Sequence, residues 1–132
     1  MAEIEMVIDT IRVSLKNNQR VLILKEKSGE RYLPIWIGEA EADAIARKLQ
    51  NVSVKRPLTH DVLYNIVNVT GLMIKSAVIT KIENDEFYAK LVIAGDKIYD
   101  IDCRPSDAIA VAMRAGAPIF AEGHVLNKAG IH

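Results

Sequence analysis

The chain has little cysteine, few aromatic residues and no excess of charge of either sign. Its single cysteine, Cys103, leaves no partner for an internal disulfide, which argues against a disulfide-stapled secreted scaffold. The 17 basic residues are balanced by 17 acidic ones. Proteins held by phosphate contacts usually carry a basic excess or a basic face, so this balance argues against tight, non-specific binding of nucleic acid.

Long apolar runs are also missing, and the start of the sequence does not predict a leader segment. The longest apolar runs, such as residues 21–24, are far shorter than the ~20 residues that span a bilayer. The first nine residues include acidic side chains and no basic start, so we do not expect a signal peptide. We predict one cytoplasmic domain over residues 1–132, with a flexible stretch from about residue 127.

The motifs of several common enzyme classes do not occur. There is no Walker loop, no dinucleotide glycine pattern, no Cys-x-x-Cys pair and no nucleophile elbow. With one tryptophan, two phenylalanines and four tyrosines, we expect stacking platforms for single-stranded nucleic acid to be scarce.

The hydrophobic pattern predicts an α+β fold of two β-meander-plus-helix units (βββα) joined by a central helix. Strands are predicted at residues 4–15, 21–24, 32–37, 72–82, 87–93 and 97–102. Helices are predicted to begin at Gly38, Thr59 and Pro105. The tetrapeptide DAIA occurs in both unit helices, at 43–46 and 107–110, which is a modest hint of internal duplication.

Three finer features are predicted from the same pattern. The alternation changes parity near residues 9–10, which indicates a bulge in the first strand. Pro34 removes a ladder donor, which places its strand at an edge or a bulge. The central helix is expected to turn Leu63, Ile66 and Val67 inward.

Acidic residues open the first predicted helix. Glu39 and Asp43 lie one turn apart, whereas Glu41 points elsewhere. The helix dipole favours acids in a first turn, and Asp43 can pair with Arg47, so a purely structural explanation suffices for them. Grouped carboxylates can also bind a divalent cation, which prefers hard oxygen ligands.

A second polar segment contains Arg56, His60 and Asp61. His60 is expected in the exposed first turn of the central helix, with Asp61 beside it. Histidine can act as a general acid or base, or as a metal ligand. Each residue is also unremarkable near a helix start, but a base, a carboxylate and a cation at one corner together suggest a site.

The third segment runs from Asp100 to Asp107. Arg104 precedes a helix whose free N–H groups favour anions, and an arginine there is suited to hold a phosphate. Alternatively, Arg104 and Asp107 form a structural ion pair across the helix entrance. For Cys103, a buried and inert thiol is the expected state.

Three motifs occur in order along the chain: LPIWIG at 33–38, RPLTHD at 56–61 and RPSDAIA at 104–110. Together they resemble the bifunctional nuclease family, from about Glu3 to Leu126. Cys103 stands where serine is more often expected, which affects none of the implied roles.

The resemblance implies hydrolysis of phosphodiester bonds in both RNA and DNA, with little preference between them. His60 would then activate water or protonate the leaving oxygen, with Asp61 orienting it. Arg56 and Arg104 would stabilise the extra negative charge of the transition state.

The same resemblance implies a candidate metal site. Glu39, Glu41 and Asp107 could hold a divalent cation such as Mg²⁺ that polarises the phosphate. Asp107 is a candidate catalytic residue as well as a candidate metal ligand.

The competing hypothesis is a non-enzymatic module that binds a ligand or a protein partner. Zero net charge, few aromatic residues and short helices with apolar stripes fit a small homo-oligomer. A dimer is favoured, formed through the strand edge marked by Pro34 or through a helix face.

Overall fold

The order of elements repeats a three-strand unit followed by a helix. The computed structural model describes residues 2–132 and confirms the α+β class. The bounds are β1 (Glu3–Val13), β2 (Arg20–Glu26), β3 (Tyr32–Ile37), α1 (Glu39–Leu49), α2 (Thr59–Val69), β4 (Met73–Glu83), β5 (Glu86–Ala94), β6 (Ile98–Cys103), α3 (Pro105–Ala115), β7 (Ile119–Glu122) and α4 (Gly123–Ala129). None of the helices in this range combines the length and the apolar character that a bilayer crossing requires.

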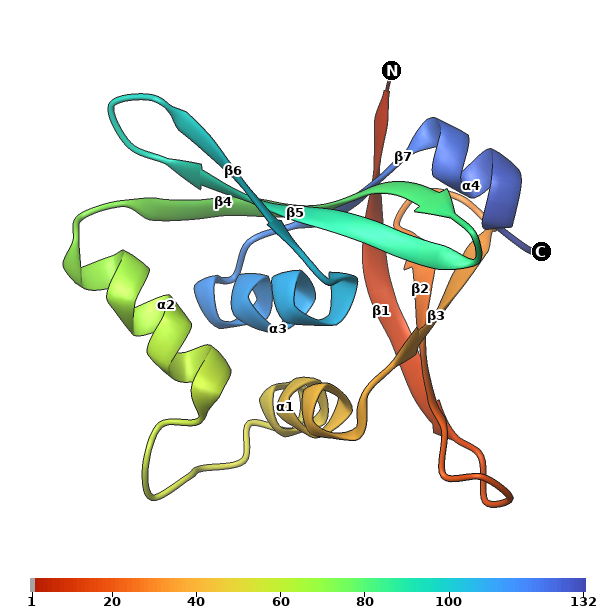
Figure 1. Ribbon diagram of the computed structural model, residues 1–132, viewed down its shortest axis with the longest axis horizontal. Coiled ribbons are helices and arrows are strands. Elements are labelled where there is room, and N and C mark those ends of the chain that lie inside the picture. The colour runs from red at the N-terminus through yellow and green to blue at the C-terminus, as the bar shows by residue number, and fades with distance from the viewer. Residues whose placement is uncertain (1) are drawn as a thin grey trace.

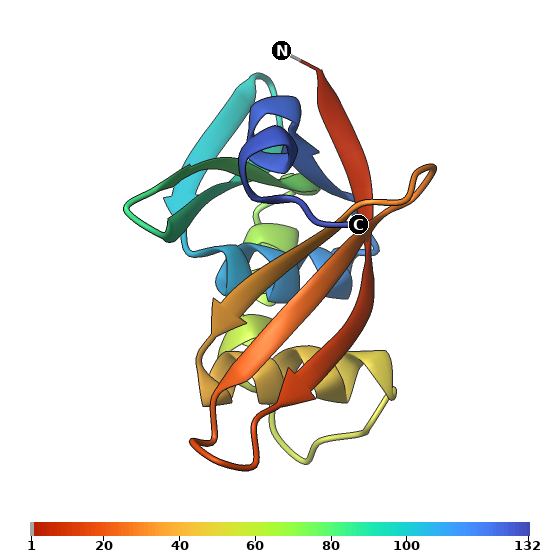
Figure 2. The same ribbon diagram turned by 90° about the vertical axis from the view of Figure 1, so that its right-hand side faces the viewer.

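The seven strands form one sheet in the order β3-β2-β1-β7-β4-β5-β6. The two predicted meanders flank β7, which is antiparallel to β1 and parallel to β4. Figure 1 shows α1, α2 and α3 together on one side of the sheet, and α4 apart from them beside the C-terminus. The sheet is curled. Its two edge strands, β3 and β6, are at opposite ends of the strand order, yet their ends border the same hollow. The curl is visible in Figure 2, where β1 to β3 cross in front of α1.

Two local irregularities predicted from the sequence are present, and β4 has two more that were not predicted, between Ile74 and Ser76 and between Ile79 and Lys81. The register between β1 and β2 shifts between Ile8 and Thr10, which confirms the predicted bulge. Pro34 lies in an edge strand, as expected for a residue without an N–H donor. Near the C-terminus, where flexibility was expected, α4 continues to Ala129 and Ile131 forms a bridge with Tyr32.

Helix α3 lies at the centre of the core. Ile109, Ala110 and Ala112 are fully buried, and the helix packs against α1, α2, β4 and β5. Leu22 and Leu24 of β2 are likewise inaccessible to solvent. Because elements from both units enclose α3, its first turn is held in a fixed position, which matters for the site that forms there.

The central helix α2 is rotated relative to the prediction. Leu63 and Ile66 are exposed rather than inward, whereas Val67 faces the core as predicted, together with His60 and Tyr64. These three residues have the i, i+4, i+7 spacing of one helical face. Apolar residues occupy both faces of this helix, so the apolar pattern alone selects neither face.

Candidate active site

The first turns of α1, α2 and α3 meet in a chain of polar side chains. Nε of Arg104 donates a hydrogen bond to Asp107 Oδ2 at 2.8 Å, and Nη2 donates to Glu41 Oε2 at 3.3 Å. The other carboxylate oxygen of Asp107 lies 2.9 Å from Nε2 of His60. We call Glu41, His60, Arg104 and Asp107 the Arg104 cluster.

The backbone around each helix start positions these groups. Pro105 occupies the first helical position of α3, and Arg104 is its N-cap residue without a side-chain cap of its own. On α1, the Glu41 carboxylate folds back over Gly38, where any Cβ would collide with it. Glycine at this corner therefore allows Glu41 to lie against the helix start and reach Arg104.

His60 is the most enclosed member of the Arg104 cluster. It is 7% exposed, although it was expected in an exposed turn. Since Asp107 is a carboxylate, we assign the proton of the neutral ring to Nε2, which donates to Asp107. Nδ1 is then the ring nitrogen that can accept a proton.

The carboxyl of Asp107 is ionised at neutral pH. Burial alone would raise its pKa, but hydrogen bonds from His60 and Arg104 and the charge of Arg104 hold the pKa of Asp107 below its ordinary 3.8. The hydrogen bond to Asp107 in turn raises the pKa of Arg104. Asp107 therefore acts as a hydrogen-bond acceptor, which suits it to orient His60 and Arg104.

Asp61 was expected to orient His60, but His60 is hydrogen-bonded to Asp107 instead. Asp61 accepts a hydrogen bond from the backbone N–H of Leu58 at 2.8 Å and pairs with Arg114 of α3. Burial would raise the pKa of Asp61, but these two contacts lower it. The buried Arg114 also donates to carbonyl oxygens of Ala110 and Ala44, so it ties α1, α2 and α3 together.

The remaining predicted residues lie outside the Arg104 cluster. Arg56 is exposed in the loop between α1 and α2. Glu39 turns towards Arg20, at 3.9 Å, and not towards Glu41. Within residues 2–132, no three His, Cys, Asp or Glu side chains are grouped to hold a metal ion. Glu41 and Asp107 are both bonded to Arg104, so the donor set does not fit a cation and we derive no step through one.

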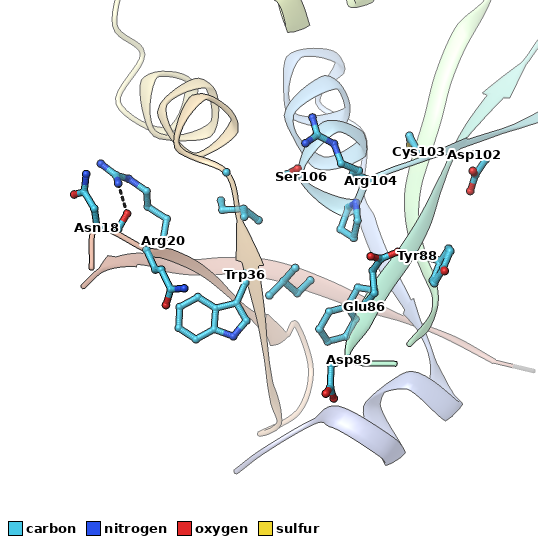
Figure 3. A pocket seen from close by; sticks show the side chains of 16 residues that line it. Asn18, Arg20, Trp36, Asp85, Glu86, Tyr88, Asp102, Cys103, Arg104 and Ser106 are labelled. Carbon is cyan, nitrogen blue, oxygen red and sulfur yellow. Dashed lines mark hydrogen bonds between the residues drawn. The ribbon is translucent and has the colours of Figure 1, made fainter. Parts of the chain in front are cut away.

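A hollow of about 760 Å³ opens beside the Arg104 cluster. Figure 3 shows Arg104 and Ser106 at the start of α3. The other walls of the hollow are formed by Trp36 of β3 and by Asp85 and Glu86, where β5 begins. Arg104 belongs to both the cluster and the hollow. It is therefore the point at which a bound molecule would meet the cluster.

Cys103 also lines the hollow but is not a nucleophile at neutral pH. Its thiol has a pKa raised to about 11, chiefly by burial and to a smaller extent by the negative charges of Asp107 and Asp102. The protonated thiol agrees with the inert role expected from the sequence.

The roles of two residues near the site, Arg114 and Trp36, were not predicted from the sequence. A basic residue in the last turn of a helix is usually explained by the helix dipole, which hides the tertiary role of Arg114. For Trp36 a signal was present: Leu33 and Ile35 alternate with it, so the tryptophan must face away from the core.

A family model described as the bifunctional nuclease domain matches residues 22–132. An uncharacterized protein of Mycobacterium tuberculosis is 45% identical over 92% of this chain and 73% of its own length. Bifunctional nuclease 2 of Arabidopsis thaliana is 30% identical over 83% of this chain, and bifunctional nuclease 1 of Oryza sativa subsp. japonica 26% identical over 89%. The chain spans only 35% and 40% of these two plant proteins. The motifs and the family model agree, and the chain belongs to the bifunctional nuclease domain family.

Proposed function

We propose that this protein hydrolyses phosphodiester bonds in RNA and DNA, with the Arg104 cluster as its active site. The observation that carries the proposal is the state of Arg104. Its side chain is 65% exposed at the hollow, while two carboxylates fix its guanidinium. A fixed, accessible arginine at a helix start is suited to bind a phosphodiester. The names of the plant relatives, bifunctional nucleases, support this choice of chemistry.

In the proposed reaction, Arg104 and the N–H groups at the start of α3 bind the non-bridging phosphate oxygens. They stabilise the additional negative charge of the transition state. His60 takes a proton from the attacking water through Nδ1, while Asp107 stabilises the protonated ring. The water oxygen bonds to phosphorus as the bond to the leaving oxygen breaks. The leaving oxygen departs on the opposite side of the phosphorus and takes a proton from solvent, and His60 then returns its own proton to solvent. Glu41 is a positioning residue, because it acts through Arg104.

Cleavage of labelled single-stranded RNA and DNA tests this proposal. Arg104→Met is expected to reduce the rate by about 10²-fold or more, because it removes the cation at the developing charge. Arg47→Met is the matched control, since Arg47 also bonds an aspartate through Nε at 2.8 Å but lies on the exposed side of α1. Identically prepared variants with equal rates would contradict the assignment. Parallel reactions with Mg²⁺ and with a chelator measure metal dependence directly.

A homodimeric binding module is the second candidate, favoured by the outer face of α2. This face exposes large apolar side chains at Val62, Leu63, Ile66 and Val69. The last turn of α2 has no basic residue, and the acid of its first turn, Asp61, is paired with Arg114. Two copies could therefore meet through this face without bringing like charges together.

Sedimentation velocity tests the second candidate. The wild-type chain should sediment as a dimer at micromolar concentration, and Ile66→Glu should convert it to a monomer by placing a charge in the apolar contact. Val13→Glu, at an exposed valine of β1, is the control and should leave the dimer intact. A monomeric wild type would contradict this candidate and leave the nuclease proposal unaffected.

A further inference from the structure

Ser106 is a buried polar residue for which the fold has no evident use. It is 4% exposed and lines the hollow. Its hydroxyl makes no hydrogen bond to another residue of the described chain. Every fully buried side-chain N or O atom in residues 2–132 has a hydrogen-bond partner. Since the Ser106 hydroxyl has none, it is not fully buried. It therefore keeps its hydrogen-bonding capacity open towards the hollow.

The surroundings of Ser106 favour an anion. Ser106 follows Pro105, so the backbone N–H groups of Ser106 and Asp107 are the first donors of an 11-residue helix. The side chain of Arg104 lies beside them, and its Nη1 group takes no part in its bonds to Asp107 and Glu41. A hydroxyl, two N–H groups and a guanidinium at one point form a suitable site for a phosphate.

Trp36 supplies a flat apolar surface to the same hollow. It is 66% exposed, which is a large apolar area to leave in water, and it is the only tryptophan in the chain. Phe87 and Tyr88 line the hollow as well. Exposed aromatic rings in a concave surface are the usual means of stacking an unpaired base.

Three acidic side chains line the hollow, and one of them lies far from α3. Asp85 lies on the turn between β4 and β5, away from Arg104 and Ser106 in Figure 3. Glu86, at the start of β5, and Asp102, near the end of β6, line the hollow nearer to α3. Carboxylates repel a phosphate but accept hydrogen bonds from the amino groups of bases and the hydroxyls of sugars. The carboxylate of Asp85, at the end far from α3, is therefore placed to meet a base or a sugar rather than the phosphate.

We propose that the hollow binds one nucleotide unit of a single-stranded nucleic acid, with its phosphate on Ser106, Arg104 and the start of α3 and its base on Trp36. This inference rests on the proposed nuclease function and names its substrate class. A duplex is excluded, because its bases are stacked on one another and cannot turn into the hollow.

Intrinsic fluorescence tests the proposal directly, because Trp36 is the only tryptophan. Five probes are compared: a nucleoside, its 5′-monophosphate, inorganic phosphate, a five-nucleotide single strand with phosphorothioate linkages, and the matching duplex. The strand should quench saturably and bind more tightly than the monophosphate, and the nucleoside should bind at least about tenfold more weakly than the monophosphate. Inorganic phosphate and the duplex should leave the fluorescence unchanged.

Ser106→Ala should weaken binding of the strand by about tenfold or more, the usual effect of losing a hydrogen bond to a charged group. Ser76→Ala is the matched control, because Ser76 is also buried, at 6% exposure, but lies on β4 outside the hollow. Absence of quenching by the strand, equal quenching by the duplex, or unchanged binding in Ser106→Ala would overturn the proposal. Quenching without any cleavage would refute the nuclease and leave the subsite standing, whereas cleavage without quenching would refute only the subsite.

Discussion

Replacing His60 with glutamine is expected to lower the cleavage of RNA and DNA by roughly 10²–10⁴-fold, the usual contribution of a general acid–base group. Glutamine keeps an N–H that can donate to Asp107, so the hydrogen bond observed at 2.9 Å has a replacement. It cannot take a proton from the attacking water. Initial rates on labelled single strands, measured at equal concentrations of folded protein, give the effect.

His124→Gln is the control for this prediction. His124 is an exposed histidine of α4, on an element outside the Arg104 cluster. Its replacement should leave the rate within about twofold of wild type, as expected for an exposed side chain without a role in the chemistry. If folded His60→Gln retained the wild-type rate, His60 would have no role in proton transfer and the proposed mechanism would be wrong.

Replacing Arg114 with methionine is expected to destabilise the fold by about 3 kcal/mol. The arginine side chain is 7% exposed, and it bonds Asp61 and two helix carbonyl groups. Methionine fills most of the space but leaves the carboxylate of Asp61 partly buried without its cation. Thermal unfolding should show the loss as a decrease in Tm of roughly 10 °C.

Arg47→Met is again the matched control, because the ion pair of Arg47 with Asp43 is exposed and should contribute less than about 0.5 kcal/mol.

The pH dependence of the stability difference between wild type and Arg114→Met is an independent check. The pKa of Asp61 is lowered in the folded state, so the stabilisation is complete above its ordinary value of 3.8 and is lost as the pH falls through the folded value. The difference between wild type and Arg114→Met should therefore be constant near neutral pH and shrink below about pH 4. A difference that grew in acid would contradict this role.

The strands were predictable because their signals are local. A change of alternation parity at residues 9–10 needs a bulge wherever the strand lies, and the shift between Ile8 and Thr10 is its result. The orientation of α2 was not predictable in the same way. Val62 and Ile66 make one face apolar and Tyr64 and Val67 another, so only the position of α3 decides which face is buried.

The candidate site was predictable in its members but not in its pairings. His60 and Asp61 are neighbours in sequence, yet adjacent residues of a helix point in different directions. The true partner of His60, Asp107, lies 47 positions away on another helix. Such a contact depends on how α2 packs against α3, which no single segment of sequence encodes. The hollow beside Trp36 is likewise formed only when the ends of β3 and β6 come close to one another.

The position of β7 has a consequence for how the chain folds. This four-residue strand is the last in sequence, yet it lies at the centre of the sheet, where Met6 of β1 pairs with Ile119 and Ala77 of β4 pairs with the same residue. The two meanders can form early from local contacts, but they cannot join until the final strand has been synthesised. Contacts of such long range are slow to form. Until then β1 and β4 each present an unpaired edge, and chains that stall at this stage are the ones at greatest risk of aggregation.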